Sequence, residues 1–199
     1  KCLESGEDVL YMGISGGISG SCWGVGLQCK ELAEKYGAER VRVLDTRGAS
    51  LGEGLVVIET AKLAKEGKSL PELETFARGL CARMQQFFVV DDLKYLHKGG
   101  RISGGARLAG TLLQVKPICR GDEEGKIVVY EKVRGKKKAL EALANIYAQT
   151  MNDPEAPIGI AHADAPADAL HLQSLLRDKG AKGEIMHVCY EPVTGAHVG

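Results

Sequence analysis

The fold follows from one stretch near the start of the chain, Val9-Leu-Tyr-Met-Gly-Ile-Ser-Gly-Gly-Ile-Ser-Gly-Ser21. Its first half, residues 9–14, is a short continuous apolar run, which is typical of a strand buried on both faces of a parallel sheet. The second half is rich in glycine and serine, which indicates a tight turn. A helix is predicted to follow, so the stretch reads as the strand, turn and helix that open an α/β protein.

Outward from this stretch, the same alternation of strands and helices continues along the chain. The helix after the turn is predicted over 20–36, with Trp23, Leu27 and Leu32 among its apolar positions and Gly37 as its end. Ser69 and Glu72 form a capping-box pattern at the start of another helix. Further strands are predicted at 41–44, 87–90, 115–119, 126–133, 158–161 and 184–189, and further helices at 52–66, 70–84, 93–96, 136–151 and 166–179.

These elements predict two α/β lobes, residues 1–86 and residues 87–199. Strands that alternate with helices in the first lobe imply a parallel sheet. In the second lobe, the strands at 115–119 and 126–133 flank a short turn, which favours an antiparallel hairpin and therefore a mixed sheet. No internal repeat or low-complexity tract interrupts either lobe.

Composition excludes several classes of protein. Twenty-six basic residues balance twenty-six acidic ones, so the positive field of a nucleic-acid-binding protein is missing. The longest uncharged run is broken by glycine and serine, so no integral membrane association is expected and the chain is placed in the cytoplasm. The six cysteines are scattered singly and no histidine lies near them at metal-ligand spacing; we expect reduced, mostly buried thiols, no metal and no cofactor.

The turn at 13–21 is the best candidate for a binding site. Small residues let backbone N–H groups converge at a helix start, and Ser15, Ser19 and Ser21 add hydroxyl donors, so the turn could hold a carboxylate or a phosphate. An ordinary turn with glycines for close packing is the alternative. The pattern matches neither a nucleotide-binding loop nor the G-x-S-x-G elbow of hydrolases.

Three residues outside the turn are further candidates. Arg101 and Arg134 each lie beside a glycine in a basic cluster, where a guanidinium can pair with a carboxylate or phosphate. His197 lies in a glycine-rich segment expected to be a loop after the last strand, and its imidazole could donate to an anion. Asp45 follows a strand and is the obvious candidate for a general base, although a role in forming the turn is the more ordinary interpretation.

Taken in order, these segments resemble the DegV family, a family of bacterial fatty-acid-binding proteins. The resemblance rests on the turn at 14–21, Val43-Leu-Asp45, Tyr95-Leu-His-Lys-Gly-Gly-Arg-Ile-Ser103, Lys132-Val-Arg-Gly-Lys-Lys-Lys-Ala139 and His197-Val-Gly199. It runs through essentially the whole chain. It implies a two-lobed fold with a ligand site between the lobes, and a first lobe that lacks its amino-terminal part here.

The resemblance also implies a function and the residues that carry it. Ser15, Gly16 and Ser19 match the turn that holds the head group of a long-chain fatty acid, and His197 matches a histidine near the carboxylate. Arg101 and Arg134 match a surface thought to meet the ATP-binding subunit of a fatty-acid kinase. The chain is then a carrier with no catalytic residue, whose bound acid is phosphorylated for phospholipid synthesis. Gly16 departs from the family pattern, which has serine there.

Two other functions stay open from the residues alone. One is an α/β enzyme that acts on a small phosphorylated metabolite, with the turn as its anion site. The other is a protein-interaction domain in which the turn has only a structural role.

A fatty acid of about C14 to C18 fits the carrier, because a buried tail offers roughly 0.8 kcal/mol of transfer free energy for each CH₂ group.

Overall fold

The computed structural model describes residues 1–102 and 114–198, so the basic stretch expected at 98–107 lies outside the described residues from Ser103 onward. The chain divides into two compact units. Unit 1 comprises residues 1–84 and 123–125, and unit 2 comprises residues 85–122 and 126–199. The boundary predicted between two lobes, at residues 86 and 87, stays a prediction.

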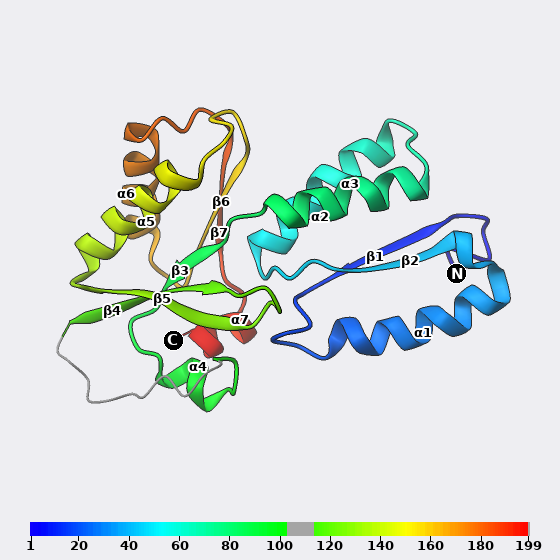
Figure 1. Cartoon of the computed structure of the whole chain (residues 1–199), viewed down its shortest axis with the longest axis horizontal. Coiled ribbons are helices and arrows are strands. Elements are labelled where there is room, and N and C mark those ends of the chain that lie inside the picture. Colours follow the sequence, from blue (N-terminus) through cyan, green and yellow to red (C-terminus); the bar gives the residue numbers. More distant parts are fainter. Residues whose placement is uncertain (103–113, 199) are drawn as a thin grey trace. The chain divides into compact units, whose positions relative to one another are not determined.

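Unit 1 is built on a parallel pair of strands, β1 (Val9–Gly13) and β2 (Val41–Asp45), as the sequence predicts. The pair is in register from Val9 opposite Val41 to Gly13 opposite Asp45. Figure 1 shows helix α1 (Ser21–Tyr36) on one side of the strands and helices α2 (Leu51–Lys65) and α3 (Leu70–Arg83) on the other. A short 3₁₀ turn, η1 (Ala38–Arg40), leads into β2.

Two apolar clusters fill the two faces of this sheet. Cys29 of α1 packs with Val41 on one face, and Leu44 packs with Val56 of α2 and Ala77 of α3 on the other. Because helices cover both faces, β1 is apolar along its length rather than alternating.

Helix α1 is confirmed at the predicted place. Its buried residues are Cys22 and Cys29, whereas the apolar side chains of Trp23 and Leu27 are 75% and 52% exposed. Helical spacing of apolar residues thus located the helix without showing which of its residues are buried in unit 1.

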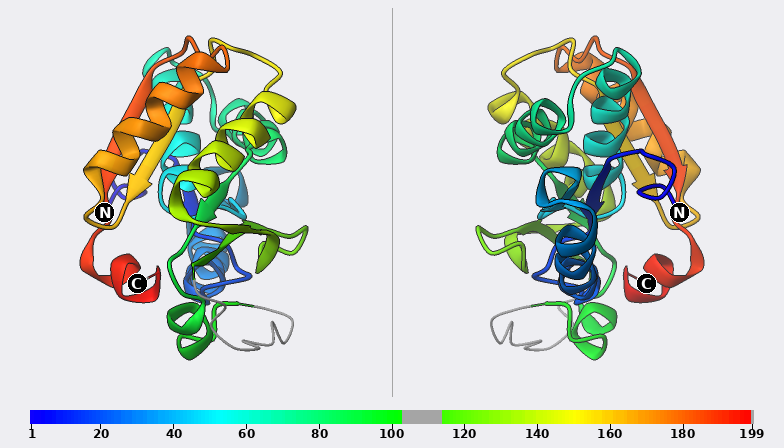
Figure 2. Two further views of the ribbon diagram at one scale, coloured as in Figure 1. Left: turned by 90° about the vertical axis from the view of Figure 1, so that its left-hand side faces the viewer. Right: turned by 90° about the vertical axis from the view of Figure 1, so that its right-hand side faces the viewer.

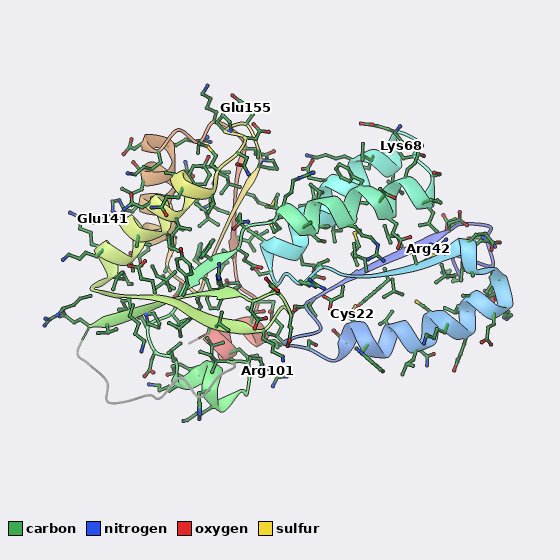
Figure 3. The ribbon with its side chains drawn as sticks, in the orientation of Figure 1. Cys22, Arg42, Lys68, Arg101, Glu141 and Glu155 are labelled. Atoms are coloured by element: carbon green, nitrogen blue, oxygen red, sulfur yellow. The ribbon has the colours of Figure 1, made fainter. Side chains whose placement is uncertain are left out.

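The capping box at the start of α3 is confirmed. The N–H and hydroxyl of Ser69 both donate to Oε2 of Glu72, at 2.8 and 2.6 Å, and a proline follows at an early helical position. On the same helix, Glu74 forms an ion pair with Arg42 of β2, with Oε2 of Glu74 3.0 Å from Nε of Arg42. Figure 3 labels Arg42 on this strand. These contacts fix α3 against the strand pair.

Unit 2 contains an antiparallel sheet in the order β3 (Phe87–Val89), β4 (Val115–Gly121), β5 (Ile127–Arg134). The predicted hairpin of β4 and β5 is confirmed. Helix α4 (Lys94–Lys98) supplies Leu96 to a cluster that also holds Cys119 and Val198, so this cluster lies against one face of the sheet. Figure 1 shows the last helix, α7 (Pro192–Val198), beside α4.

The rest of unit 2 is a second, parallel strand pair. Strands β6 (Ile158–His162) and β7 (Ile185–Cys189) pair in parallel, and the helices are α5 (Lys136–Thr150) and α6 (Pro166–Asp178). In both views of Figure 2, α6 runs beside β6 and β7. Parallel and antiparallel sheets thus occur together in the second part of the chain, as the mixed-sheet prediction requires.

The carboxyl-terminal segment corrects one prediction. His197 was expected in a loop, but it lies in helix α7. The start signal is Glu191-Pro192: the carboxylate of Glu191 accepts hydrogen bonds from the N–H groups of Val193 and Thr194 at 2.6 and 2.8 Å. Proline suits an early helical position because its missing N–H is not needed there.

No helix within the described residues is long and apolar enough to cross a membrane.

Candidate functional site

The turn between β1 and α1 places Ser15 inside unit 1 rather than at its surface. Ser15 is 1% exposed, and its hydroxyl donates to the carbonyl of Gly125 at 2.7 Å. The same oxygen accepts the N–H of Gly17 at 3.2 Å. Gly125 must be glycine, because its φ is +75° and a Cβ there would lie 2.1 Å from the Ser15 hydroxyl. The one hydroxyl proton of Ser15 is therefore used within the protein.

Gly16, where the resemblance led us to expect a serine, is engaged by Asp45. The N–H of Gly16 donates to Oδ2 of Asp45 at 3.0 Å, and a Cβ at Gly16 would lie 2.7 Å from the same oxygen. Oδ1 of Asp45 accepts the N–H of Arg47 at 2.8 Å. Asp45 thus orders two turns with its two carboxylate oxygens, which agrees with the turn-forming interpretation.

The turns that follow β1 and β2 form one hydrogen-bonded assembly. The buried hydroxyl of Thr46 donates to the carbonyl of Gly13 at 2.8 Å, and the N–H of Ser15 donates to the carbonyl of Gly48 at 2.8 Å. Ligands of open parallel sheets bind at this carboxyl edge of the strands. Thr46 was not among the predicted residues. Its position as a polar residue directly after a strand could have indicated it.

Ser19 and Ser21 lie at the start of α1. The Ser19 hydroxyl donates to the Ser21 hydroxyl at 3.1 Å and accepts the Ser21 N–H at 3.3 Å. Ser19 is half-buried and Ser21 is exposed. The amino terminus of a helix carries partial positive charge, so a carboxylate is favoured here. Of the two serines expected to hold a head group, Ser19 is therefore closer to solvent than Ser15.

Near the turn, the thiol of Cys22 and the carboxyl of Glu53 have raised pKa values. Burial raises the pKa of Cys22, and the charges of Asp45 and Glu53 add to this. Burial also raises the pKa of the Glu53 carboxyl and raises that of Cys119, in unit 2, to about 12. Figure 3 labels Cys22 at the start of α1. All six cysteines are free. Cys22, Cys29 and Cys119 are buried, as predicted for most of the thiols, whereas Cys81 is half-buried and Cys2 and Cys189 are exposed.

His197 lies in unit 2, against the turn that follows α4. A Cβ built on Gly99 would lie 2.6 Å from Nδ1 of His197, so the imidazole rests on the backbone of that glycine. The guanidinium of Arg101 donates to the carbonyl of the same glycine. The structure therefore brings together two segments that are far apart in sequence, the Gly-Gly-Arg turn and the carboxyl terminus.

Arg101 and Arg134 are both exposed but mark different ends of one strand. Ile102 forms a bridge with Ile127, the first residue of β5, and Arg134 is its last residue. A strand rises about 3.3 Å per residue, so the backbones at these two ends lie roughly 23 Å apart. The arginines cannot hold one small anion together, although both fit within the footprint of a protein partner. Figure 3 labels Arg101 after α4.

Each unit also has a hollow. In unit 1 an apolar groove of about 390 Å³ runs between β1 and helices α2 and α3, with Leu10, Met12 and Ala61 among its lining residues. In unit 2 a hollow of about 620 Å³ is lined by Gln114, Lys116, Gly135 and Lys136. Over residues 1–102 and 114–198, no cluster of three or more His, Cys, Asp or Glu side chains could hold a metal ion.

The fold and the turn define an α/β protein with a hydrogen-bonded Ser/Gly-rich turn at the carboxyl edge of a parallel strand pair. A family model described as "Uncharacterised protein, DegV family COG1307" matches residues 1–199, and the chain belongs to the DegV family. The DegV domain-containing protein CPE0026 of Clostridium perfringens is 33% identical over 198 residues, which are 99% of this chain and 68% of that protein. The chain thus spans about two thirds of the length of such relatives.

Solved structures of family members share the fold. The fatty acid binding DegV protein SAG1342 of Streptococcus agalactiae is 34% identical with a TM-score of 0.86, over 99% of this chain and 69% of that one. A DegV protein of Ruminococcus gnavus, refined with vaccenic acid, is 27% identical with a TM-score of 0.89, over 99% and 72%. The Fatty Acid Kinase (Fak) B3 protein of Streptococcus pneumoniae, loaded with linoleic acid, shares the fold at 20% identity and a TM-score of 0.84, over 99% and 71%.

Proposed function

We propose that this protein binds a long-chain fatty acid and acts as a carrier rather than as an enzyme. The observation that carries the proposal is the likeness, over 99% of the chain and at 34% identity, to a family member that binds fatty acid. The hydroxyls of Ser19 and Ser21 at the start of α1 support it, because a carboxylate taken from water needs such donors. A cytoplasmic location is part of the proposal.

The head-group site is assigned to Ser19 and His197. Ser19 lies at the positive end of α1 with its hydroxyl near solvent, and His197 offers a ring nitrogen. Ser15 and Gly16 already donate to Gly125 and Asp45, so we assign them first to the shape of the turn. Direct contact of these two with the ligand, and a ligand position between two lobes, stay predictions.

The carrier presents the carboxylate to a separate ATP-binding kinase subunit, and Arg101 and Arg134 belong to the surface that meets it. Their separation of roughly 23 Å suits a protein partner, since interfaces commonly bury about 800 Å² on each side. Lys137 and Lys138 are exposed beside Arg134, at the amino terminus of α5. Cations are unfavourable at that end of a helix, so their clustering there supports a role in binding an acidic surface.

The test is native mass spectrometry, with denaturing lipid extraction, on the full-length natural protein purified from a bacterial host. We expect one C14 to C18 fatty acid per protein, at roughly 0.8 kcal/mol of transfer free energy per buried CH₂ group. The double variant Ser19→Ala/His197→Ala should lose it. His171→Ala removes an exposed histidine of α6 and serves as the matched control that keeps the lipid.

Two outcomes separate the alternatives. Protein that is lipid-free and takes up no added oleate contradicts the carrier and favours an enzyme of small phosphorylated metabolites. If the lipid is present, the cognate kinase subunit is added with ATP, and Arg134→Glu should slow acyl-phosphate formation while lipid content stays unchanged. Equal rates for Arg134→Glu and the natural protein contradict the docking surface alone.

A further inference from the structure

We propose that Gly99 is the positioning residue for His197: its missing side chain leaves the space in which the imidazole is held. The proposal rests on the proposed function, because it concerns a histidine assigned to the fatty-acid head group. It assigns to the first glycine of the Gly-Gly-Arg turn a role in ligand binding that is separate from the backbone geometry of the turn.

The geometry is that of a ring lying on a backbone. A Cβ at Gly99 would lie 2.6 Å from Nδ1 and 3.2 Å from Cε1 of His197, and 3.3 Å from the carbonyl oxygen of Tyr95. The first distance is far shorter than carbon and nitrogen tolerate without a bond, since non-bonded contacts are favourable only near 3.5–4.0 Å. Any larger residue at position 99 must therefore move the imidazole.

Backbone conformation does not explain the glycine. Gly99 has φ −72° and ψ −11°, which every residue adopts readily. Its neighbour Gly100 has φ +69° and nothing near its Cβ position, so that glycine is explained by conformation. The two adjacent glycines thus have different physical reasons, conformation at 100 and space at 99.

Contacts at both ends of α7 fix the place of the ring. Val198, the next residue after the histidine, packs on the cluster formed by Leu93, Leu96 and Cys119, so the end of α7 is anchored. Glu191 holds the start of α7 through backbone N–H groups. With both ends of the helix held, the imidazole can yield only by rotating its own side chain.

Arg101 also contacts Gly99, through the backbone carbonyl. Its guanidinium donates to the Gly99 carbonyl, which lies at the carboxyl end of α4, where a cation is favourable. The turn is therefore held in place without help from His197. Gly99→Ala should consequently displace the flexible ring and leave the backbone of the turn as it is.

The experiment uses the full-length protein with four variants: Gly99→Ala, His197→Ala, the double variant, and Gly195→Ala as control. Gly195 is also in unit 2, has nothing within 4 Å of its Cβ position and has no positive φ. Two readouts are measured. The ring resonance of His197 in the ligand-free protein reports its position, and oleate titration reports affinity.

We expect Gly99→Ala to shift the His197 ring resonance and to weaken oleate binding about 10- to 150-fold, as His197→Ala does. The double variant should lose no more than either single variant, because both act on one group. Gly195→Ala should change neither readout. An unshifted resonance in Gly99→Ala overturns the inference. A shifted resonance with unchanged affinity in Gly99→Ala overturns the ligand-binding role of Gly99. If His197→Ala also keeps its affinity, the head-group role of His197, and with it that part of the proposed function, is contradicted as well.

Discussion

At the scale of single residues, the turn after β1 depends on the buried hydroxyl of Ser15. It donates to the carbonyl of Gly125 at 2.7 Å and accepts the N–H of Gly17 at 3.2 Å. Ser15→Ala leaves both backbone groups without this partner in a buried place. We expect the free energy of unfolding to fall by about 1–3 kcal/mol, measured by urea denaturation.

Ser19→Ala is the matched control for this prediction. Its hydroxyl bonds only to Ser21 in the described contacts, close to solvent, so water can replace it and the loss should stay within about 0.5 kcal/mol. Lipid content should respond in the opposite order, with Ser19→Ala the more damaging. If Ser15→Ala proves neutral for stability, the hydroxyl does not support the turn, and its head-group role gains weight.

The residues of the turn also show what the sequence could tell about the site. The pattern of glycine and serine located the turn and its carboxyl-edge position correctly. It could not separate a hydroxyl that faces a ligand from one that bonds to the chain, because the partner of Ser15 is Gly125, 110 residues away. The contact of His197 with Gly99 is equally remote in sequence.

At the scale of elements, the capping box of α3 makes a quantitative prediction. The N–H and hydroxyl of Ser69 both donate to the carboxylate of Glu72. Ser69→Ala removes the cap, so the free energy of unfolding should fall by about 1 kcal/mol near neutral pH. Ser174→Ala, at an exposed position inside α6, is the control; it should be neutral or slightly stabilising, because alanine is the better helix former.

The loss should depend on pH with a definite sign. Hydrogen bonds from Ser69 lower the pKa of the Glu72 carboxyl below its ordinary value of 4.5. A lowered pKa contributes stability that is present above the ordinary value and disappears as pH falls through the lowered one. The difference between Ser69→Ala and the natural protein should therefore shrink in acid. A difference that stays constant below that range would show that the carboxylate is not part of the cap.

Elements were predicted well where the signal is local. The Ser69 cap, the β4–β5 hairpin and the strands β1 and β2 depend on neighbouring residues, and the structure confirms them. Helix α7 was missed, because its glycine suggested a loop while Glu191-Pro192 set a helix start. Capping overrode the apparent pattern there.

At the scale of the whole molecule, the affinity of the proposed carrier should depend on the chain length of the fatty acid. The polar contacts of the carboxylate are the same for every fatty acid, whereas each buried CH₂ group adds about 0.8 kcal/mol, or roughly fourfold in affinity. We expect the dissociation constant of the full-length protein to fall about fourfold per carbon from C12 upward. It should level off at the chain length beyond which added CH₂ groups are no longer buried.

The measurement is a titration with saturated fatty acids of increasing length, kept below the concentrations at which they form micelles. Methyl esters of the same acids are the controls: they keep the tail and lose the charge, so they should show the same slope at uniformly weaker affinity. Equal affinity for acids and esters would mean that Ser19 and His197 do not hold the carboxylate. Affinity that does not vary with length would mean that the tail stays in water, and a protein of that kind could not carry an acyl chain between partners.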